Sequence, residues 1–176
     1  MAAENDSKNK RGRTVETDRV NRILENEVFR EHLGKNKEAE KDRIFCRHDM
    51  VHFLDVARIG MIFNLRENLQ ISEDLLYAAA LLHDIGKHEQ YENGTPHEEA
   101  SARIAPLILE KCGYTEAEIA EITEAVLQHR TKSVAGEPTL SGVLYRADKK
   151  SRACFACEAK EACNWSNEKK NLTLGV

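Results

Sequence analysis

The chain has 176 residues, and its 26 basic and 30 acidic side chains give a formal net charge of −4. A usual domain size of roughly 100–200 residues leaves room for one compact domain plus tails and excludes a two-domain enzyme. The acidic balance argues against a protein that coats nucleic acid or an anionic membrane. The longest apolar run, from Leu75 to Leu82, is far shorter than the roughly 20 residues of a membrane span. We therefore expect a soluble, cytoplasmic protein with no membrane partner and no stable nucleic-acid partner.

The first third of the chain predicts a tail and two helices. Residues 1–13 are polar, with basic residues near their end, and are expected to form a disordered tail. From residue 14, apolar side chains recur at helical spacing as far as Leu33, and Gly34 is expected to end this first helix. A charged linker over 34–43 follows. The stretch from about 49 to 69 places Phe53, Val56 and Ala57 on one stripe and predicts a buried second helix.

The remaining sequence predicts further helices, for a total of about six. Ser72 is expected to cap a helix through LLYAAALLHD, which is apolar nearly all round and should cross the core. Thr95 with Glu98, and Thr115 with Glu118, have the spacing of capping boxes, so helices are predicted from about 96 to 111 and from about 116 to 129. A last core helix is predicted over about 139–150. Because no alternating strand pattern is found, the expected fold is an all-α bundle over 14–152. A cysteine-containing segment over 153–176 is expected to pack on this bundle.

Several histidines fall near the ends or on the apolar faces of these predicted helices, where a bundle can bring them together. They are His52, His83, His97 and His129. His83 is followed directly by Asp84, about 100° away on a helix. One metal ion could bind both His83 and Asp84 only if the helix ends there, which Gly86 suggests. Alternatively, Asp84 could reach across to a second metal ion. Imidazole with carboxylate suits transition metals, with iron or manganese the first choice and cobalt, nickel or zinc as alternatives.

These residues resemble the motifs of the HD-domain superfamily of metal-dependent phosphohydrolases, over roughly residues 45–152. His52 in HFLDVAR, His83-Asp84 in LLHDIGK and Asp148 in LYRADKKSR match the family pattern in order and spacing. His97 and His129 are placed like the two extra histidines of members with two metals. The resemblance implies an all-helical bundle in which His52, His83, Asp84 and Asp148 hold one metal. Asp84, His97 and His129 would hold the other.

The same resemblance implies hydrolysis of a phosphate ester or anhydride of a small molecule, with a nucleotide as the expected substrate. Two cations would bind phosphate oxygens and lower the pKa of the attacking water, so Asp84 is a candidate catalytic residue as well as a ligand. Lys87 resembles the lysine that contacts the metal-bound water or the substrate phosphate in the HDxGK form of the family. Arg130, Lys132 and Arg146 are candidates for phosphate contacts, with solvated surface charge as the alternative reading.

Five cysteines, an odd number, favour metal or redox chemistry over a disulfide framework. Cys154 and Cys157 have a C-x2-C spacing, and Cys163 follows six residues later. Cys46 is the candidate fourth ligand, because it closely precedes His52, which is expected to lie near the start of the cysteine segment. A zinc site or an iron–sulfur cluster would follow, and unligated thiols are the alternative.

Other functions stay open from the sequence. The ligand order is similar to both the diadenosine tetraphosphate hydrolases and the HD-GYP cyclic dinucleotide phosphodiesterases, although the Gly-Tyr-Pro signature of the latter is absent from this chain. Some HD-domain proteins that resemble this set are di-iron oxygenases, and a non-catalytic metal or redox sensor is a third alternative. The charged first helix could pack within one chain or between two copies, which leaves a homodimer open.

Overall fold

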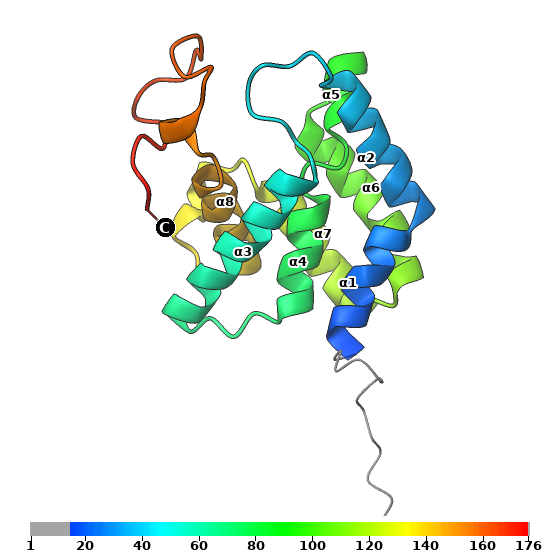
Figure 1. Cartoon of the computed structure of the whole chain (residues 1–176). Helices are drawn as coiled ribbons and strands as arrows, with labels where there is room; N and C mark the ends of the chain where they lie inside the picture. The colour runs from blue at the N-terminus through cyan, green and yellow to red at the C-terminus, as the bar shows by residue number, and fades with distance from the viewer. Residues whose placement is uncertain (1–14, 176) are drawn as a thin grey trace, which may run out of the picture.

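The computed structural model describes residues 15–175, which form an all-α fold as expected, with no strand within this range (Figure 1). The α-helices are α1 (Val15–Glu25), α2 (Glu27–Ala39), α3 (Met50–Glu67), α4 (Glu73–Leu82), α5 (Lys87–Glu92), α6 (His97–Cys112), α7 (Glu116–Gln128) and α8 (Leu140–Lys150). Two short 3-10 helices are η1 (Lys132–Gly136) and η2 (Cys154–Ala156). Within the described range, no helix combines the length and apolar character needed to cross a membrane. The predicted tail over 1–13 lies outside the described residues.

Helix α4 forms the centre of the bundle and packs against α1, α3, α7 and α8 (Figure 1). Its residues from Ala78 to Leu82 are completely buried, in agreement with the prediction of a helix that crosses the core. Helix α3 also packs on α8, and α6 packs on α7. The chain leaves α4 at His83 and Asp84, so both side chains start inside the protein.

Several predicted helix boundaries are confirmed. The Asp49 carboxylate accepts the backbone N–H groups of Val51 and His52 and so starts α3. Thr115 and Glu118 form the reciprocal capping box that their spacing predicts. Gly113 has a φ of 88°, in the left-handed region where a glycine costs least, and ends α6.

The prediction of a single N-terminal helix is wrong. The chain breaks at Asn26, whose side-chain oxygen accepts the backbone N–H groups of Val28 and Phe29, so two helices replace one. Gly34 does not end the second of these, because α2 continues to Ala39, into the predicted charged linker. A glycine inside a helix costs about 1 kcal/mol relative to alanine, which the burial of Phe29 on the same helix outweighs.

The capping box predicted at Thr95 does not form. Helix α6 begins at His97, and no side chain caps it. The Thr95 hydroxyl donates to the side-chain oxygen of Asn93, and Glu98 pairs with Arg130 at 3.4 Å. The Glu98 carboxylate, which was predicted to cap α6, therefore forms an ion pair near the candidate metal centre instead. Ser72 does precede α4 as predicted, but it makes no side-chain cap hydrogen bond.

A tight turn joins α4 to α5, a helix that the sequence pattern missed because six residues are too few to show a period. Gly86 lies in this turn, against α6. A Cβ atom at Gly86 would come within 2.7 Å of the Ala100 Cβ and of the Ser101 backbone nitrogen. The Gly86 N–H donates to the Ser101 hydroxyl at 2.9 Å. The absence of a side chain at Gly86 lets this turn pack directly on α6.

We expect Gly86→Ala to lower the free energy of unfolding by about 2–3 kcal/mol, because the added methyl group meets backbone atoms that cannot move aside easily. Gly34→Ala is the matched control. It adds the same group at an exposed helical position with nothing within 4 Å, and should raise stability by about 0.5–1 kcal/mol. Urea unfolding followed by circular dichroism measures both. Equal effects of the two variants would contradict the close packing at Gly86.

Candidate metal centre

The structure brings all six predicted ligand residues together around the carboxylate of Asp84. His52 lies in the first turn of α3, His83 and Asp84 directly follow α4, His97 begins α6, His129 directly follows α7, and Asp148 lies in α8. Each of these side chains is at most 9% exposed. Helix ends supply most of the set, so side chains from several helices reach one point inside the bundle.

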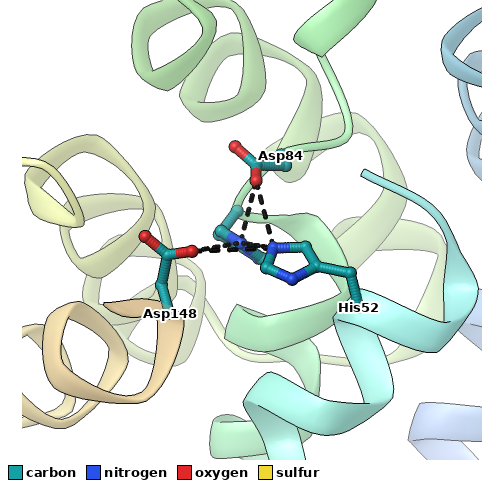
Figure 2. Close-up of side chains that lie close together, drawn as sticks. His52, Asp84 and Asp148 are labelled. Carbon is teal, nitrogen blue, oxygen red and sulfur yellow. Dashed lines mark hydrogen bonds and ion pairs between the residues drawn. The ribbon is translucent and has the colours of Figure 1, made fainter. Parts of the chain in front are cut away.

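The two oxygens of Asp84 face two different pairs of imidazoles. Its Oδ2 lies 3.0 Å from Nε2 of His83 and 3.4 Å from Nε2 of His52. Its Oδ1 lies 3.0 Å from Nε2 of His97 and 3.5 Å from Nε2 of His129. Asp148 completes the first group, with Oδ1 3.6 Å from Nε2 of His52, and Figure 2 shows both carboxylates directed at the His52 ring. The resulting groups of four and three residues each have their ligand atoms within 4.8 Å of one another.

Hydrogen bonds to the Nδ1 atoms of two imidazoles fix the orientation and the tautomer of these rings. Nδ1 of His83 lies 2.7 Å from the Ala80 carbonyl oxygen, and Nδ1 of His129 lies 2.6 Å from the Val126 carbonyl oxygen. A carbonyl only accepts, so Nδ1 carries the hydrogen in both rings. Nε2 is then the atom that can take a proton or a metal, and in both rings it faces Asp84.

The chemistry of this cluster fits divalent transition metals. Oδ1 of Asp84 is buried and has no hydrogen-bond partner in the part of the chain that the structure describes. The Nε2 atoms of His97 and His129 lie 3.2 Å apart, as do those of His52 and His83. Two nitrogen atoms that bind the same metal ion, each at about 2.0–2.1 Å, lie at about this distance from each other. A cation at each position would satisfy the carboxylate and both rings.

Electrostatics favour a cation at the same place. Burial opposes ionisation of Asp84, but the surrounding imidazoles, His83 and His48 foremost, outweigh burial and hold the pKa of this carboxyl well below its usual value. Burial also opposes protonation of His83, yet Asp84 and Asp148 raise the pKa of that imidazole. A proton attracted by two carboxylates can be displaced by a metal ion.

His48 adds a fifth imidazole that was not in the predicted ligand set. Its Nε2 lies 3.8 Å from Oδ2 of Asp84, and its Nδ1 lies 2.5 Å from Oε1 of Glu40. Glu40 also accepts the His48 backbone N–H and the Tyr91 hydroxyl. Glu40 was assigned to a charged linker from sequence, and only the folded chain reveals that it holds an imidazole against the centre.

Lys87 lies at the same site, at the first position of α5. Its Nζ is 3.1 Å from Nδ1 of His97 and 3.4 Å from the Gln90 side-chain oxygen. No carboxylate lies within 4.0 Å of this ammonium among the described residues, although the residue is only 8% exposed. Burial lowers the pKa of Lys87, and the Asp84 carboxylate opposes that shift. A buried cation without an acidic partner is suited to an anionic ligand.

The centre opens into a cleft of about 900 Å³. Ten lysine and arginine side chains line the cleft, against three carboxylates, two of which are Asp84 and Asp148. Arg130 and Lys132 are among the basic residues, as predicted for phosphate contacts. Arg146 is not: it forms a two-pronged ion pair with Glu67 and does not line the cleft. It lies two positions before Asp148 on α8, and residues two apart on a helix do not share a face.

The four cysteines predicted to share a metal or cluster line the same cleft, but they do not form a closed site. Cys46, Cys154, Cys157 and Cys163 are all free. Within residues 15–175, no three of their sulfur atoms lie within 4.8 Å of one another. Burial raises the pKa of the Cys46 thiol, and the charge of Arg152 opposes this shift. A shared zinc ion or iron–sulfur cluster there stays a prediction.

Comparison with known proteins agrees with this geometry. The HD domain family matches residues 50–157, a span that contains all six clustered residues, and the chain belongs to this family. An uncharacterized protein of Clostridium beijerinckii is 46% identical over 157 residues, which cover 89% of this chain and 98% of that protein. The crystal structure of a predicted HD superfamily hydrolase from an uncultured Thermotogales bacterium is 27% identical. The match covers 80% of this chain and 79% of the other, with a TM-score of 0.58. Family and fold together support a metal-dependent phosphohydrolase in general, with a His/Asp cluster able to hold divalent metal.

We expect Asp84→Ala to lose all metal bound at this centre, because both ligand groups use its carboxylate. His97→Ala removes a ligand from one group only and should retain about half of the metal. Mass spectrometry of metal content after reconstitution with Mn²⁺ measures both variants. Identical metal content in Asp84→Ala and His97→Ala would contradict a carboxylate shared between two ions.

A second prediction concerns Glu40. Burial opposes ionisation of Glu40, but hydrogen bonds and charge from His48 lower its pKa from 4.5 to about 2. A lowered folded-state pKa contributes stability above pH 4.5 that is lost as the pH falls toward 2. Glu40→Gln should therefore be less stable than the wild type at pH 7, by at most about 3 kcal/mol, and the difference should shrink below about pH 4. Urea unfolding at several pH values measures this; a difference that grows on acidification would contradict it.

Proposed function

We propose that this protein is a metal-dependent phosphohydrolase that uses water to cleave a phosphate ester or anhydride of a nucleotide-sized molecule. The position of Asp84 between two imidazole pairs carries the proposal, because it offers two adjacent cation positions with one shared ligand. Paired metal ions about 3.5–4 Å apart are typical of phosphate-cleaving centres. Metals held there would act as Lewis acids on a phosphate oxygen and favour ionisation of the attacking water.

The side chains around the centre have separable roles in this proposal. His52, His83, Asp84 and Asp148 would hold one metal, and Asp84, His97 and His129 would hold the other. Lys87 would bind a phosphate oxygen, because its ammonium lines the cleft beside His97 and lacks an acidic partner in the described structure. Its positive charge at that point would stabilise the negative charge that develops on the transferred group.

The cleft supports a substrate of nucleotide size. Its volume of about 900 Å³ falls within the range of roughly 300–1,000 Å³ that is usual for small-molecule sites. Its lining is strongly basic although the protein is acidic overall, which favours an anionic substrate. Arg130 follows His129 in the turn after α7, and Lys132 begins η1, so both place positive charge close to His129 in the chain.

The test is an anaerobic screen for hydrolysis of nucleotides, dinucleoside polyphosphates and cyclic dinucleotides with Mn²⁺, Fe²⁺ or Co²⁺, with the products separated by anion-exchange chromatography. We expect turnover with at least one substrate and none in Asp84→Ala. Lys87→Ala should bind metal normally but lower kcat by about 100-fold, the effect typical of removing one charge-stabilising donor. Arg146→Ala is the matched control. It removes a cation of the same bundle that points away from the cleft, and its rate should stay within about twofold of wild type.

One outcome would reject the proposal, and another would remove only the role assigned to Lys87. No hydrolysis product from any compound of the screen, with two metals verified as bound, would contradict the proposed hydrolysis. Consumption of dioxygen by the protein with two bound irons would then favour an oxygenase. Unchanged turnover in Lys87→Ala would separately remove the assigned role of the lysine while keeping the metal centre.

A further inference from the structure

The positive lining of the cleft extends well beyond the metal centre. Lys149, Lys150 and Arg152 come from the end of α8 and the residues directly after it. Lys160 and Lys169 belong to the C-terminal segment, residues 153–175, most of which follows the end of the HD family match at residue 157. In Figure 1 this segment, drawn in orange and red, lies above α8. We call these five residues, Lys149, Lys150, Arg152, Lys160 and Lys169, the basic wall of the cleft. The chain carries a net charge of −4, so this local concentration of positive charge does not follow from its overall composition.

Little acidic charge neutralises this wall. Lys149 and Arg152 share one partner, Asp148, at 2.6 and 3.2 Å. Asp148 is itself in the candidate metal group, so a bound metal would compete for the same carboxylate. In the part of the chain that the structure describes, Lys150 and Lys169 have no carboxylate within 4.0 Å. The wall therefore keeps net positive charge.

Arg152 is the most enclosed cation of the wall. Its side chain is 10% exposed, and its guanidinium stacks over the Trp165 ring at 4.6 Å. Nη2 donates to Asp148, but Nη1 is buried and finds no hydrogen-bond partner within residues 15–175. A buried donor without a partner is unfavourable until an acceptor binds to it. The planar guanidinium fork is well suited to a phosphate group as that acceptor.

The C-terminal segment is built as a wall of the cleft and not as part of the core. Among residues 153–175, only Cys154 is buried, and η2 is the only regular element. The Asn171 amide donates to the carbonyls of Lys149 and Arg152, which ties the segment to the end of α8. Long irregular segments that keep a defined path beside a site are usually functional.

We propose that Arg152, Lys150 and Lys169 form a second anion subsite, and that the ligand of the cleft carries two or more phosphate groups in a chain. One phosphate would lie at the metal centre and another on this wall. The inference rests on the proposed function, because that function places the first phosphate. A chain of phosphates provides the repeated negative charge that an extended set of cations matches, whereas a single phosphate leaves this wall unused.

Trp165 gives a direct readout, because it is the only tryptophan of the chain and lines the cleft against Arg152. The full-length protein is titrated with inorganic tripolyphosphate or orthophosphate in EDTA, which removes metal-held phosphate from the measurement. We expect a saturable change in Trp165 emission, with a Kd for tripolyphosphate at least tenfold lower than for orthophosphate. The Lys150→Ala/Lys169→Ala double variant should raise the tripolyphosphate Kd at least tenfold.

The matched control is Lys37→Ala/Lys111→Ala, which removes the same charge from exposed positions outside the cleft. Its tripolyphosphate Kd should stay within about twofold of wild type. Equal Kd values for the two double variants, or for tripolyphosphate and orthophosphate, would overturn the subsite. Asp84→Ala should retain the emission change while losing turnover. An emission change without hydrolysis of any phosphate compound would reject the proposed function and keep the subsite. Hydrolysis of a phosphate compound without an emission change would reject the subsite and keep the proposed function.

Discussion

The candidate metal centre is organised around one buried carboxylate. Asp84 is 2% exposed and holds four imidazole Nε2 atoms within 3.5 Å, a position that is tolerable only because opposite charge or hydrogen bonds surround it. The fold places Asp84 at this buried position. Helix α4 carries the chain through the core, Gly86 turns it against α6, and the Asn36 amide donates to the Asp84 carbonyl at 2.9 Å. Backbone and side chain of Asp84 are therefore both fixed by the fold.

The use of helix ends explains how a bundle can build such a centre. Inside a helix, neighbouring side chains point in different directions, so one helix can give few ligands to one point. At His83 and His129 the helices have just ended, and the Nδ1 atoms bond carbonyls of the last turn, at Ala80 and Val126. Carbonyl groups of the last helical turn thus orient the imidazoles that face the candidate metal position.

The sequence predicts the all-α fold and most helix boundaries because capping and glycine signals act locally. Thr115 with Glu118 and Gly113 behave as local chemistry requires. Predictions fail where tertiary packing decides. Gly34 stays helical in spite of its weak propensity, and Glu98 makes an ion pair across the chain with Arg130 where its spacing predicted a cap. The motif pattern identifies Asp84 and the five other residues of its cluster, whereas Glu40 carries no motif and is recognised only from its contact with His48.

Basic side chains are concentrated in one region of this acidic protein. The chain has a formal net charge of −4, yet ten basic side chains gather at one cleft. The ligand cluster lies inside the family match over residues 50–157. Lys160, Trp165 and Lys169 lie beyond the match, on an irregular segment fixed by a few polar bonds. In the proposed function, the metal ligands and the cations that would meet the rest of the substrate therefore lie on separate parts of the chain. A change in those cations would leave the residues around Asp84 in place.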